Sequence, residues 1–249
     1  MTTDFYNKVA QKFGNYHTGA KYFSEFPNGE PEKIFKEKLT AISGKKKTAL
    51  DVGCADGRFT ISVAPLFQKI TAIDLSQGML EAAKKLQQEQ SINNINFEEQ
   101  NASQTNYADD SFDVAYSRRG PTPYHEFQRV LKSSGYFVGI NIGEKDCQEI
   151  KEIFGRGQGF NQWHTSALEK AKQNLLENNF FIIFAQDYFY NEYYQSPEDL
   201  DLFLQGVPIF EDYDPENDKK MLKSYVAKFS IKKGIKFPRH RFVIVAQKL

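Results

Sequence analysis

The stretch at residues 50–58 restricts the possible fold more than any other part of the chain. It reads Leu-Asp-Val-Gly-Cys-Ala-Asp-Gly-Arg: a short apolar run, a glycine-containing turn and the start of a helix. Glycines in such a turn let the backbone approach a ligand closely, and the N-terminus of the helix offers free N–H donors. The stretch therefore predicts a buried strand that leads through a ligand-binding turn into a helix.

Further strand and helix patterns alternate along the chain. Five short apolar runs are typical of strands separated by helices, at 48–52, 70–74, 95–98, 112–117 and 136–142. Two later β-rich runs, at 180–187 and 242–246, flank additional helices. This order predicts a doubly wound, Rossmann-like α/β fold with a seven-stranded sheet, in which the last strand is inserted antiparallel beside its predecessor.

The chain is expected to form a single domain over residues 1–249, because it shows no repeat, low-complexity segment or linker. Within that domain we expect a helical cap at 1–40, a cofactor-binding core at 46–142 and a helical lid insert at 188–233. Residues able to cap a helix N-terminus predict helix starts at three later points, after Ser166, Ser196 and Asp214.

The charge composition argues against some classes of partner. Lys+Arg and Asp+Glu both total 32, so nothing draws the whole protein toward nucleic acid or an anionic membrane. The basic stretch at 232–241 is interpreted as a solvated face, with His240 on the surface. Two cysteines are too few for a disulfide framework or a four-ligand zinc site, so no metal is expected. With no signal-peptide pattern and no membrane-spanning apolar run, we expect a soluble, cytoplasmic protein.

The turn at 53–58 does not fit a phosphate-bearing ligand. It departs from the G-x-G-x-x-G pattern of dinucleotide sites and lacks the Gly-Lys-Ser/Thr of a P-loop. Asp51 and Asp56 would repel a pyrophosphate, but they suit the ammonium group of S-adenosylmethionine. Asp74, at the end of the second strand, can accept hydrogen bonds from both ribose hydroxyls. Asn101, after the third strand, can bond the edge of an adenine.

These segments, in this order, resemble class I S-adenosylmethionine-dependent methyltransferases over about residues 46–142. The resemblance covers the Asp-x-Gly-x-(Gly/Ala)-x-Gly loop, the ribose acid, the adenine loop, the Phe-Asp-Val strand at 112–114 and the Arg-Val-Leu-Lys turn at 129–132. Departures are Ala55 for the middle glycine, Asn101 for a common acid, and Ser133-Ser134 for Pro-Gly. The resemblance implies S-adenosylmethionine as cofactor. The residues it implies for the cofactor site are Asp51, Gly53, Cys54, Ala55, Gly57, Asp74, Leu75, Met79, Asn101, Ala102 and Ser117.

The methyl acceptor is less constrained, because transfer from a sulfonium needs alignment more than a dedicated base. Residues 117–121 do not resemble the Asn/Asp-Pro-Pro-Tyr/Phe motif of exocyclic amino-group enzymes, and neither cysteine follows a proline. Residues 119–131 partly resemble ribosomal-RNA guanine-N1 methyltransferases, which carry a zinc module absent here. The chain looks more like quinone- and biotin-pathway enzymes, which implies a small-molecule acceptor as partner and no membrane. An RNA base methyltransferase and a non-catalytic cofactor-binding protein remain the alternatives.

Several residues are candidates for the acceptor side of the site. His125 and His164 are candidate bases, although a surface position is the competing interpretation for each. Arg118 and Arg119 can hold an acidic acceptor, or one of them pairs with Glu126. We further expect the aromatic-rich segments 1–25 and 188–213 to cover the site and to order on cofactor binding. The residues expected to line the acceptor pocket are Tyr16, Arg118, Tyr124, Trp163 and Tyr193.

Overall fold

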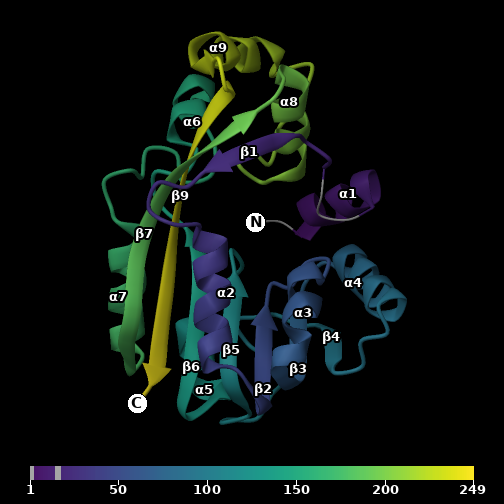
Figure 1. Ribbon diagram of the computed structural model, residues 1–249, viewed down its shortest axis with the longest axis vertical. Helices are drawn as coiled ribbons and strands as arrows, with labels where there is room; N and C mark the ends of the chain where they lie inside the picture. Colours follow the sequence, from purple (N-terminus) through teal and green to yellow (C-terminus); the bar gives the residue numbers. More distant parts are fainter. Residues whose placement is uncertain (1–2, 15–17) are drawn as a thin grey trace.

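The computed structural model describes residues 3–14 and 18–249, which form one mixed α/β molecule (Figure 1). Its helices are α1 (Thr3–Phe13), α2 (Pro31–Ile42), α3 (Arg58–Val63), η1 (Ala64–Leu66), α4 (Gln77–Glu89), α5 (Tyr124–Val130), α6 (Gln148–Phe154), α7 (Ala167–Glu177), α8 (Pro197–Gly206) and α9 (Lys219–Phe229). Its strands are β1 (Tyr22–Glu25), β2 (Gly44–Val52), β3 (Phe67–Asp74), β4 (Ile95–Glu99), β5 (Phe112–Arg118), β6 (Leu131–Ile142), β7 (Phe180–Tyr194), β8 (Ser230–Ile231) and β9 (Gly234–Lys248).

The strands form one sheet in the order β1-β7-β9-β6-β5-β2-β3-β4, with β8 paired to β9. Strands β2 to β6 are parallel neighbours, whereas β9 runs antiparallel between β6 and β7. The predicted Rossmann-like architecture and its antiparallel last strand are therefore confirmed. The predicted number of seven strands is too low, because the described residues add β1 at the outer edge of β7 and the two-residue β8.

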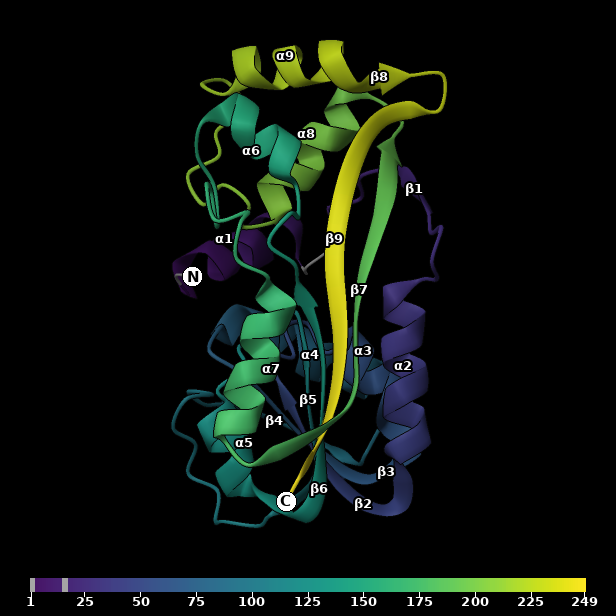
Figure 2. The ribbon, with the colours of Figure 1, turned by 90° about the vertical axis from the view of Figure 1, so that its left-hand side faces the viewer.

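Helices cover both faces of the sheet (Figure 2). Neighbouring residues of one strand point to opposite faces: Val114 packs with α2, α3 and α4, whereas Ala115 packs with α5 and α7. Val243 and Ile244 of β9 divide in the same way. Because both faces are buried, these strands are continuous apolar runs in the sequence, and for that reason they could be predicted.

Strands β7 and β9 are each fifteen residues long and continue beyond the rest of the sheet (Figure 1). Their far ends form a third apolar cluster with α6, α8 and α9, centred on Tyr194, Tyr225 and Phe237. The runs at 180–187 and 242–246 therefore marked only part of each strand. The remainder carries polar and charged residues that pair mainly with the opposite strand, such as Glu192 across from Phe237.

Helix starts follow their capping residues in two of the three predicted places. Ser166 accepts a hydrogen bond from the Glu169 amide and Ser196 accepts one from the Asp199 amide, both at 3.1 Å. The start predicted after Asp214 is wrong, since α9 begins only at Lys219. Asp214 instead accepts from the amides at 216 and 217, at 3.0 and 2.8 Å, and so closes a tight turn. In the described part of the chain, every helix is too short or too polar to cross a membrane.

Candidate functional site

The loop after β2 is held in close contact with its neighbours. The amides of Gly53 and Cys54 both donate to the Ile73 carbonyl, at 2.9 and 3.1 Å, which fixes the loop to β3. Gly53 has a φ of 77°, and a Cβ there would lie 3.1 Å from Gly120, in the loop after β5. Gly57 has a φ of 71°, and a Cβ there would lie 2.7 Å from a ring atom of Phe97. Both glycines are therefore required by backbone conformation and by space.

Asp74 joins this loop to the start of α4. Its Oδ2 accepts a hydrogen bond from the Ala55 amide and its Oδ1 accepts one from the Ser76 amide, each at 2.9 Å. Burial raises the pKa of Asp74, although the backbone amides act in the opposite direction. The carboxylate thus stands at the carboxyl ends of β2 and β3, and each oxygen keeps a further lone pair for a ligand hydroxyl.

Asp51 lies behind the loop. Its side chain is buried, and its Oδ2 accepts a hydrogen bond of 2.6 Å from Thr60 in α3. Burial raises the pKa of Asp51 to about 7, despite the bond from Thr60 and the nearby positive charge of Arg118. Asp51 in β2 and Asp74 at the end of β3 are therefore two acids next to the same loop, and burial raises the pKa of both.

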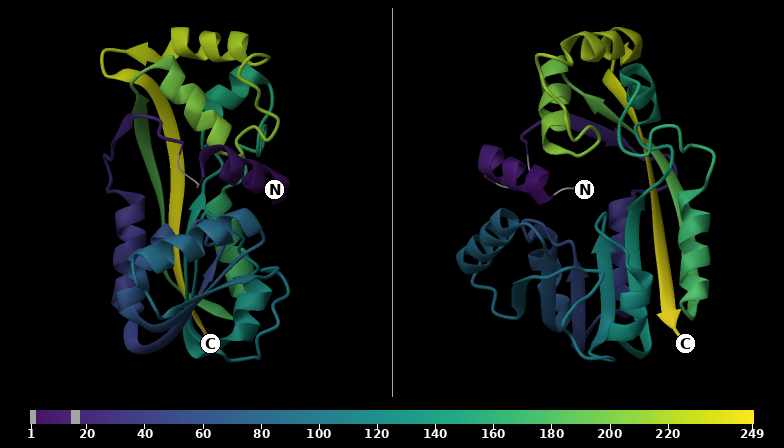
Figure 3. Two further views of the ribbon diagram at one scale, coloured as in Figure 1. Left: turned by 90° about the vertical axis from the view of Figure 1, so that its right-hand side faces the viewer. Right: turned by 180° about the vertical axis from the view of Figure 1, so that it is seen from behind.

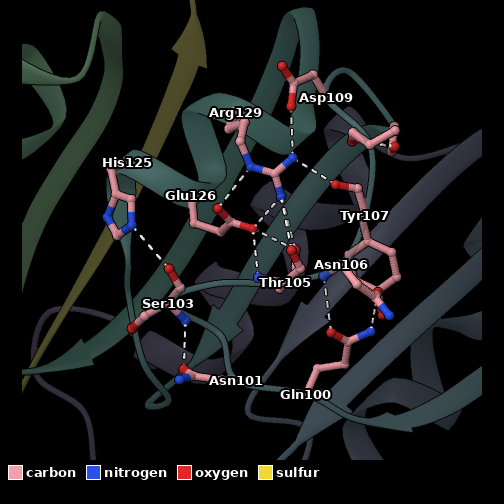
Figure 4. A network of polar contacts seen from close by, with 12 residues as sticks. Gln100, Asn101, Ser103, Thr105, Asn106, Tyr107, Asp109, His125, Glu126 and Arg129 are labelled. Atoms are coloured by element: carbon pink, nitrogen blue, oxygen red, sulfur yellow. Dashed lines mark hydrogen bonds and ion pairs between the residues drawn. The ribbon is translucent and has the colours of Figure 1, made fainter.

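The loop after β4, residues 100–111, is attached to α5 by a network of polar contacts (Figure 4). Asn101 accepts from the Ser103 amide at 3.0 Å, and the Ser103 carbonyl lies 3.1 Å from Nε2 of His125. Glu126 is buried, accepts from the Thr105 amide at 2.9 Å and pairs with Arg129 at 2.6 Å. Burial acts to raise the pKa of Glu126, but the bonds from Arg129 and Thr105 outweigh it and lower the pKa to about 2.

The other predicted cofactor residues lie around these two loops. Leu75 is exposed beside Asp74, whereas Met79, in the first turn of α4, is buried. Cys54 and Ala102 are buried, one in each of the two sheet-facing apolar clusters. Ser117, at the end of β5, donates from its hydroxyl to the Val52 carbonyl at 3.1 Å. The structure therefore brings Asp74, Leu75 and Ser117 to the carboxyl ends of the central strands.

The acceptor-side candidates are more widely spread. Tyr124 packs against Phe137 at a ring distance of 5.6 Å, and Trp163 against Phe160 at 5.9 Å. His125 and His164 are both exposed, and His125 is engaged with the loop after β4. Tyr193 stacks on a residue of β1, Phe23, at 5.1 Å. Tyr16 lies outside the described residues.

Arg118 and Arg119 do not pair with Glu126 as one alternative expected. Both converge on Glu32, at the start of α2, with Nε-to-carboxylate distances of 2.8 Å for Arg118 and 3.5 Å for Arg119. Glu126 is engaged with Arg129 instead, one turn along the same helix. Glu32 is 86 residues from Arg118 in sequence, and no local pattern pointed to it.

The interpretation of 232–241 as a solvated face is wrong for its last three residues. Arg239, His240 and Arg241 are 6%, 1% and 2% exposed. Asp146, in the loop after β6, pairs with both arginines, and Glu192 of β7 pairs with Arg239 at 2.6 Å. His240 points the other way, with its ring stacked on Phe189 at 4.1 Å and Nε2 2.9 Å from Asp187. A signal in the sequence was available: Arg239 and Arg241 are two residues apart directly before an apolar run, which is the spacing of side chains on one face of a strand.

Comparisons with known proteins agree with this arrangement. A family model described as a methyltransferase domain matches residues 43–179, more than half of the chain. The chain belongs to the methyltransferase family. The matched part runs from the start of β2 to the end of α7, so that Glu32, Glu192 and the arginines of β9 lie outside it.

Individual methyltransferases show the same likeness. The uncharacterized methyltransferase YcgJ of Bacillus subtilis is 28% identical over 124 residues, 44% of this chain and 49% of that protein. Its crystal structure superposes with a TM-score of 0.64 at 16% identity, covering 87% of this chain and 98% of YcgJ. A demethylmenaquinone methyltransferase of Oceanobacillus iheyensis is 31% identical over 39% of this chain and 45% of its own length. A SAM-dependent methyltransferase from Aquifex aeolicus has a TM-score of 0.52 at 14% identity, covering 88% and 90%. The chain spans about half the length of the curated relatives it matches.

Proposed function

We propose that this methyltransferase binds S-adenosylmethionine and transfers its methyl group to a small molecule. The observation that carries the proposal is the position of Asp74. Its two oxygens accept from Ala55 and Ser76, so the carboxylate is fixed at the edge of the glycine loop and keeps acceptor capacity for a pair of ribose hydroxyls.

The donor groups around Asp74 fit this cofactor. A side chain at Gly53 or Gly57 would clash with Gly120 or Phe97, so the two glycines keep the loop packed against its neighbours, next to Asp74. Leu75 and the loop at 101–103 would flank the adenine, and Asp51 would act behind the loop on the ammonium group. Bound there, the sulfonium supplies a methyl group that is already activated for displacement.

The chain itself contributes position rather than proton transfer. Ser117 ties the end of β5 to the end of β2, so that the loops on the two strands keep a fixed relation. Arg118 and Arg119 follow directly, and their bonds to Glu32 bring the start of α2 to the same edge. We propose that an acceptor is held against this edge and aligned with the methyl group, which is the main requirement of an in-line displacement.

A small-molecule acceptor is favoured over RNA by the burial of the last three residues of the basic stretch, 239–241. Arg239 and Arg241, which an RNA-binding surface would have to expose, are buried and paired with acids. The name of one relative, demethylmenaquinone methyltransferase, also describes a small-molecule acceptor. Release of labelled methyl groups to a metabolite extract, and not to total RNA, would support the proposal and would exclude a non-catalytic cofactor-binding protein.

Calorimetry with S-adenosylhomocysteine tests the cofactor assignment. Asp74→Ala should weaken binding by about 1.5–3 kcal/mol, the usual scale for hydrogen bonds to a charged group. Glu81→Ala, which removes an exposed carboxylate from the nearby α4, should leave the affinity unchanged. NAD should not bind. Unchanged affinity in Asp74→Ala would place the ribose elsewhere.

A further inference from the structure

Strand β6 has β5 and β9 as its neighbours in the sheet, and four arginines and three acids lie on these strands or in the segments next to them. Arg118 and Arg119 come from the end of β5, and Arg239 and Arg241 from β9. The acids come from three other segments: Glu32 in α2, Asp146 after β6 and Glu192 in β7. The strand register brings the groups together, because Arg118 lies beside Ile140 of β6, and Ile140 lies beside Val243, two residues after Arg241 in β9.

In the first half of this cluster, the charge of Arg239 is compensated by acids. Arg239 donates from Nε to Asp146 at 3.0 Å and from Nη1 to Glu192 at 2.6 Å. Its guanidinium also lies 5.3 Å from the ring centre of Phe203 and 5.5 Å from that of Phe237. Two charge-assisted bonds and two aromatic faces satisfy this arginine, which therefore holds the antiparallel pair β7 and β9 to the loop after β6.

The other half carries more positive than negative charge. Glu32 is shared by Arg118 and Arg119, and Asp146 is shared by Arg239 and Arg241. Lys151 adds a further buried cation, which donates to the Asp146 carbonyl at 2.8 Å. Glu32 and Asp146 are thus each shared between two guanidinium groups.

Arg241 and Arg118 each have N–H groups that make no hydrogen bond to the described residues. Within the described part of the chain, Arg241 makes hydrogen bonds only through Nη1, to Asp146 and to the His240 carbonyl, although it is 2% exposed. With residues 3–14 and 18–249, Arg118 makes a side-chain hydrogen bond only through Nε, to Glu32. Burial acts to raise the pKa of Glu32, but the positive charges of Arg119, Arg118 and Arg241 outweigh it and lower the pKa. Arg241 is buried and paired with Asp146, whereas the side chain of Arg118 is 33% exposed, so an anion that reaches Arg118 can use the remaining N–H groups of both arginines.

The cluster also adjoins the proposed cofactor site. Ser117, next to Arg118, donates to the last residue of β2, and Arg118 is close enough to Asp51 to influence that carboxyl. We propose that the methyl acceptor carries a carboxylate, which Arg118 and Arg241 bind beside the shared acid Glu32. This inference rests on the proposed function, since it names the class of molecule that would receive the methyl group. A guanidinium binds a carboxylate through paired N–H groups, and a neutral acceptor would leave the excess charge uncompensated.

Benzoate and benzamide provide a matched probe, because the two molecules have the same shape and differ in charge. Their binding to the protein saturated with S-adenosylhomocysteine can be measured by ligand-observed NMR. We expect benzoate to bind at least about tenfold more tightly than benzamide. Arg118→Gln and Arg241→Gln should each remove most of that preference. Lys172→Gln, a loss of one cation on the distant α7, should leave it intact.

Glu32→Gln gives a test of opposite sign. It removes the acid that competes for Arg118, so benzoate should bind several-fold more tightly, and misfolding cannot produce such a gain. Equal affinity for benzoate and benzamide, with S-adenosylhomocysteine still bound, would overturn the inference.

The cofactor's own carboxylate is the other source of the same chemistry. If Arg118→Gln weakens S-adenosylhomocysteine at least tenfold but leaves 5′-methylthioadenosine, which lacks the amino-acid end, unaffected, the arginine serves the cofactor and the inference is overturned. Failure of the unaltered protein to bind S-adenosylhomocysteine would instead overturn the proposed function.

Discussion

Ala55 adopts a left-handed backbone conformation, with a φ of 46°, in the loop between β2 and α3. This conformation costs a residue with a side chain about 1–2 kcal/mol, partly offset by the greater unfolded-state entropy of glycine. Ala55→Gly should therefore raise the free energy of unfolding by about 0.5–1 kcal/mol. Ala82→Gly, inside α4, should lower it by about 1 kcal/mol. Urea denaturation measures both, and a loss of stability in both variants would contradict the expectation.

Asp51 should make stability depend on pH in a direction unusual for an aspartate. Burial raises its pKa to about 7, so the folded protein holds this proton more tightly than the unfolded chain. Relative to Asp51→Asn, the unaltered protein should lose stability as the pH rises from about 4 to 7 and stay lower above that. At pH 8 the variant should melt about 2–8 °C higher.

Asp113→Asn is the matched control for that experiment. Burial acts to raise the pKa of Asp113, but hydrogen bonds from Thr48 and Lys132 outweigh it and lower the pKa. Its contribution to stability is therefore present above the unfolded pKa and lost in acid, so this variant should be less stable at pH 8. If thermal unfolding shows the same sign for both variants at pH 8, the account of Asp51 is wrong.

How far the sequence predicts a residue depends on how local its environment is. Asp51, Gly53 and Asp74 were identifiable because one loop and two adjacent strands define their surroundings. The burial of Arg239 was not, since its partners Asp146 and Glu192 lie 93 and 47 residues away in sequence. From the sequence alone an arginine is predicted to be exposed, because it is buried only where the fold places an acid beside it.

At the scale of elements, α5 stabilises the loop after β4 through Arg129. This side chain donates to Glu126, to Asp109 and to the Tyr107 carbonyl (Figure 4). Arg129→Gln would leave the carboxylate of Glu126 buried without its cation, at an expected cost of about 1.5–3 kcal/mol in unfolding free energy. Lys172→Gln breaks an exposed pair and should cost under about 0.5 kcal/mol.

Arg129→Gln should also change how stability depends on pH in acid. Because the pKa of Glu126 is about 2, its stabilising contribution is present above the unfolded pKa and declines as the pH falls toward 2. Arg129→Gln should flatten this part of the stability curve, which urea denaturation between pH 6 and pH 3 would detect. A parallel curve displaced by a constant amount would assign the loss to packing instead.

Elements were predicted well where packing made them apolar and less well where they leave the core. The apolar part of β9 was visible at 242–246, but the seven residues before it pair with β7 and include lysine, arginine, proline and aromatic side chains. Strand β1 was missed because its four residues become a strand only by pairing with the far end of β7. Such pairing depends on tertiary structure rather than on local propensity.

At the scale of the whole molecule, the two segments expected to cover the site are joined. Strand β1 pairs with 191–194 of β7, and the Lys21 amide donates to Asp199 of α8 at 2.8 Å. Helix α1 lies between the two halves of the molecule, next to α4 and α8 (Figure 3). It contacts α4 where Ser76 donates to Asn7 at 2.7 Å, and it contacts α8 where Lys12 donates to Gln205.

This arrangement sharpens the expectation of a lid that orders on cofactor binding. Residues 22–25 and 188–194 belong to a continuous β-ladder, so their amides should resist hydrogen exchange with or without ligand. Helix α1 has no such ladder. Its Asn7 accepts a hydrogen bond from Ser76, which lies two residues after the ribose-binding candidate Asp74. We therefore expect S-adenosylhomocysteine to slow exchange in α1 several-fold and to leave β1 unchanged. Asn7→Ala should reduce that protection, and Lys84→Gln, on the exposed side of α4, should not. Equal exchange of α1 in the free and bound protein would mean that the helix is permanently docked and that the site opens elsewhere.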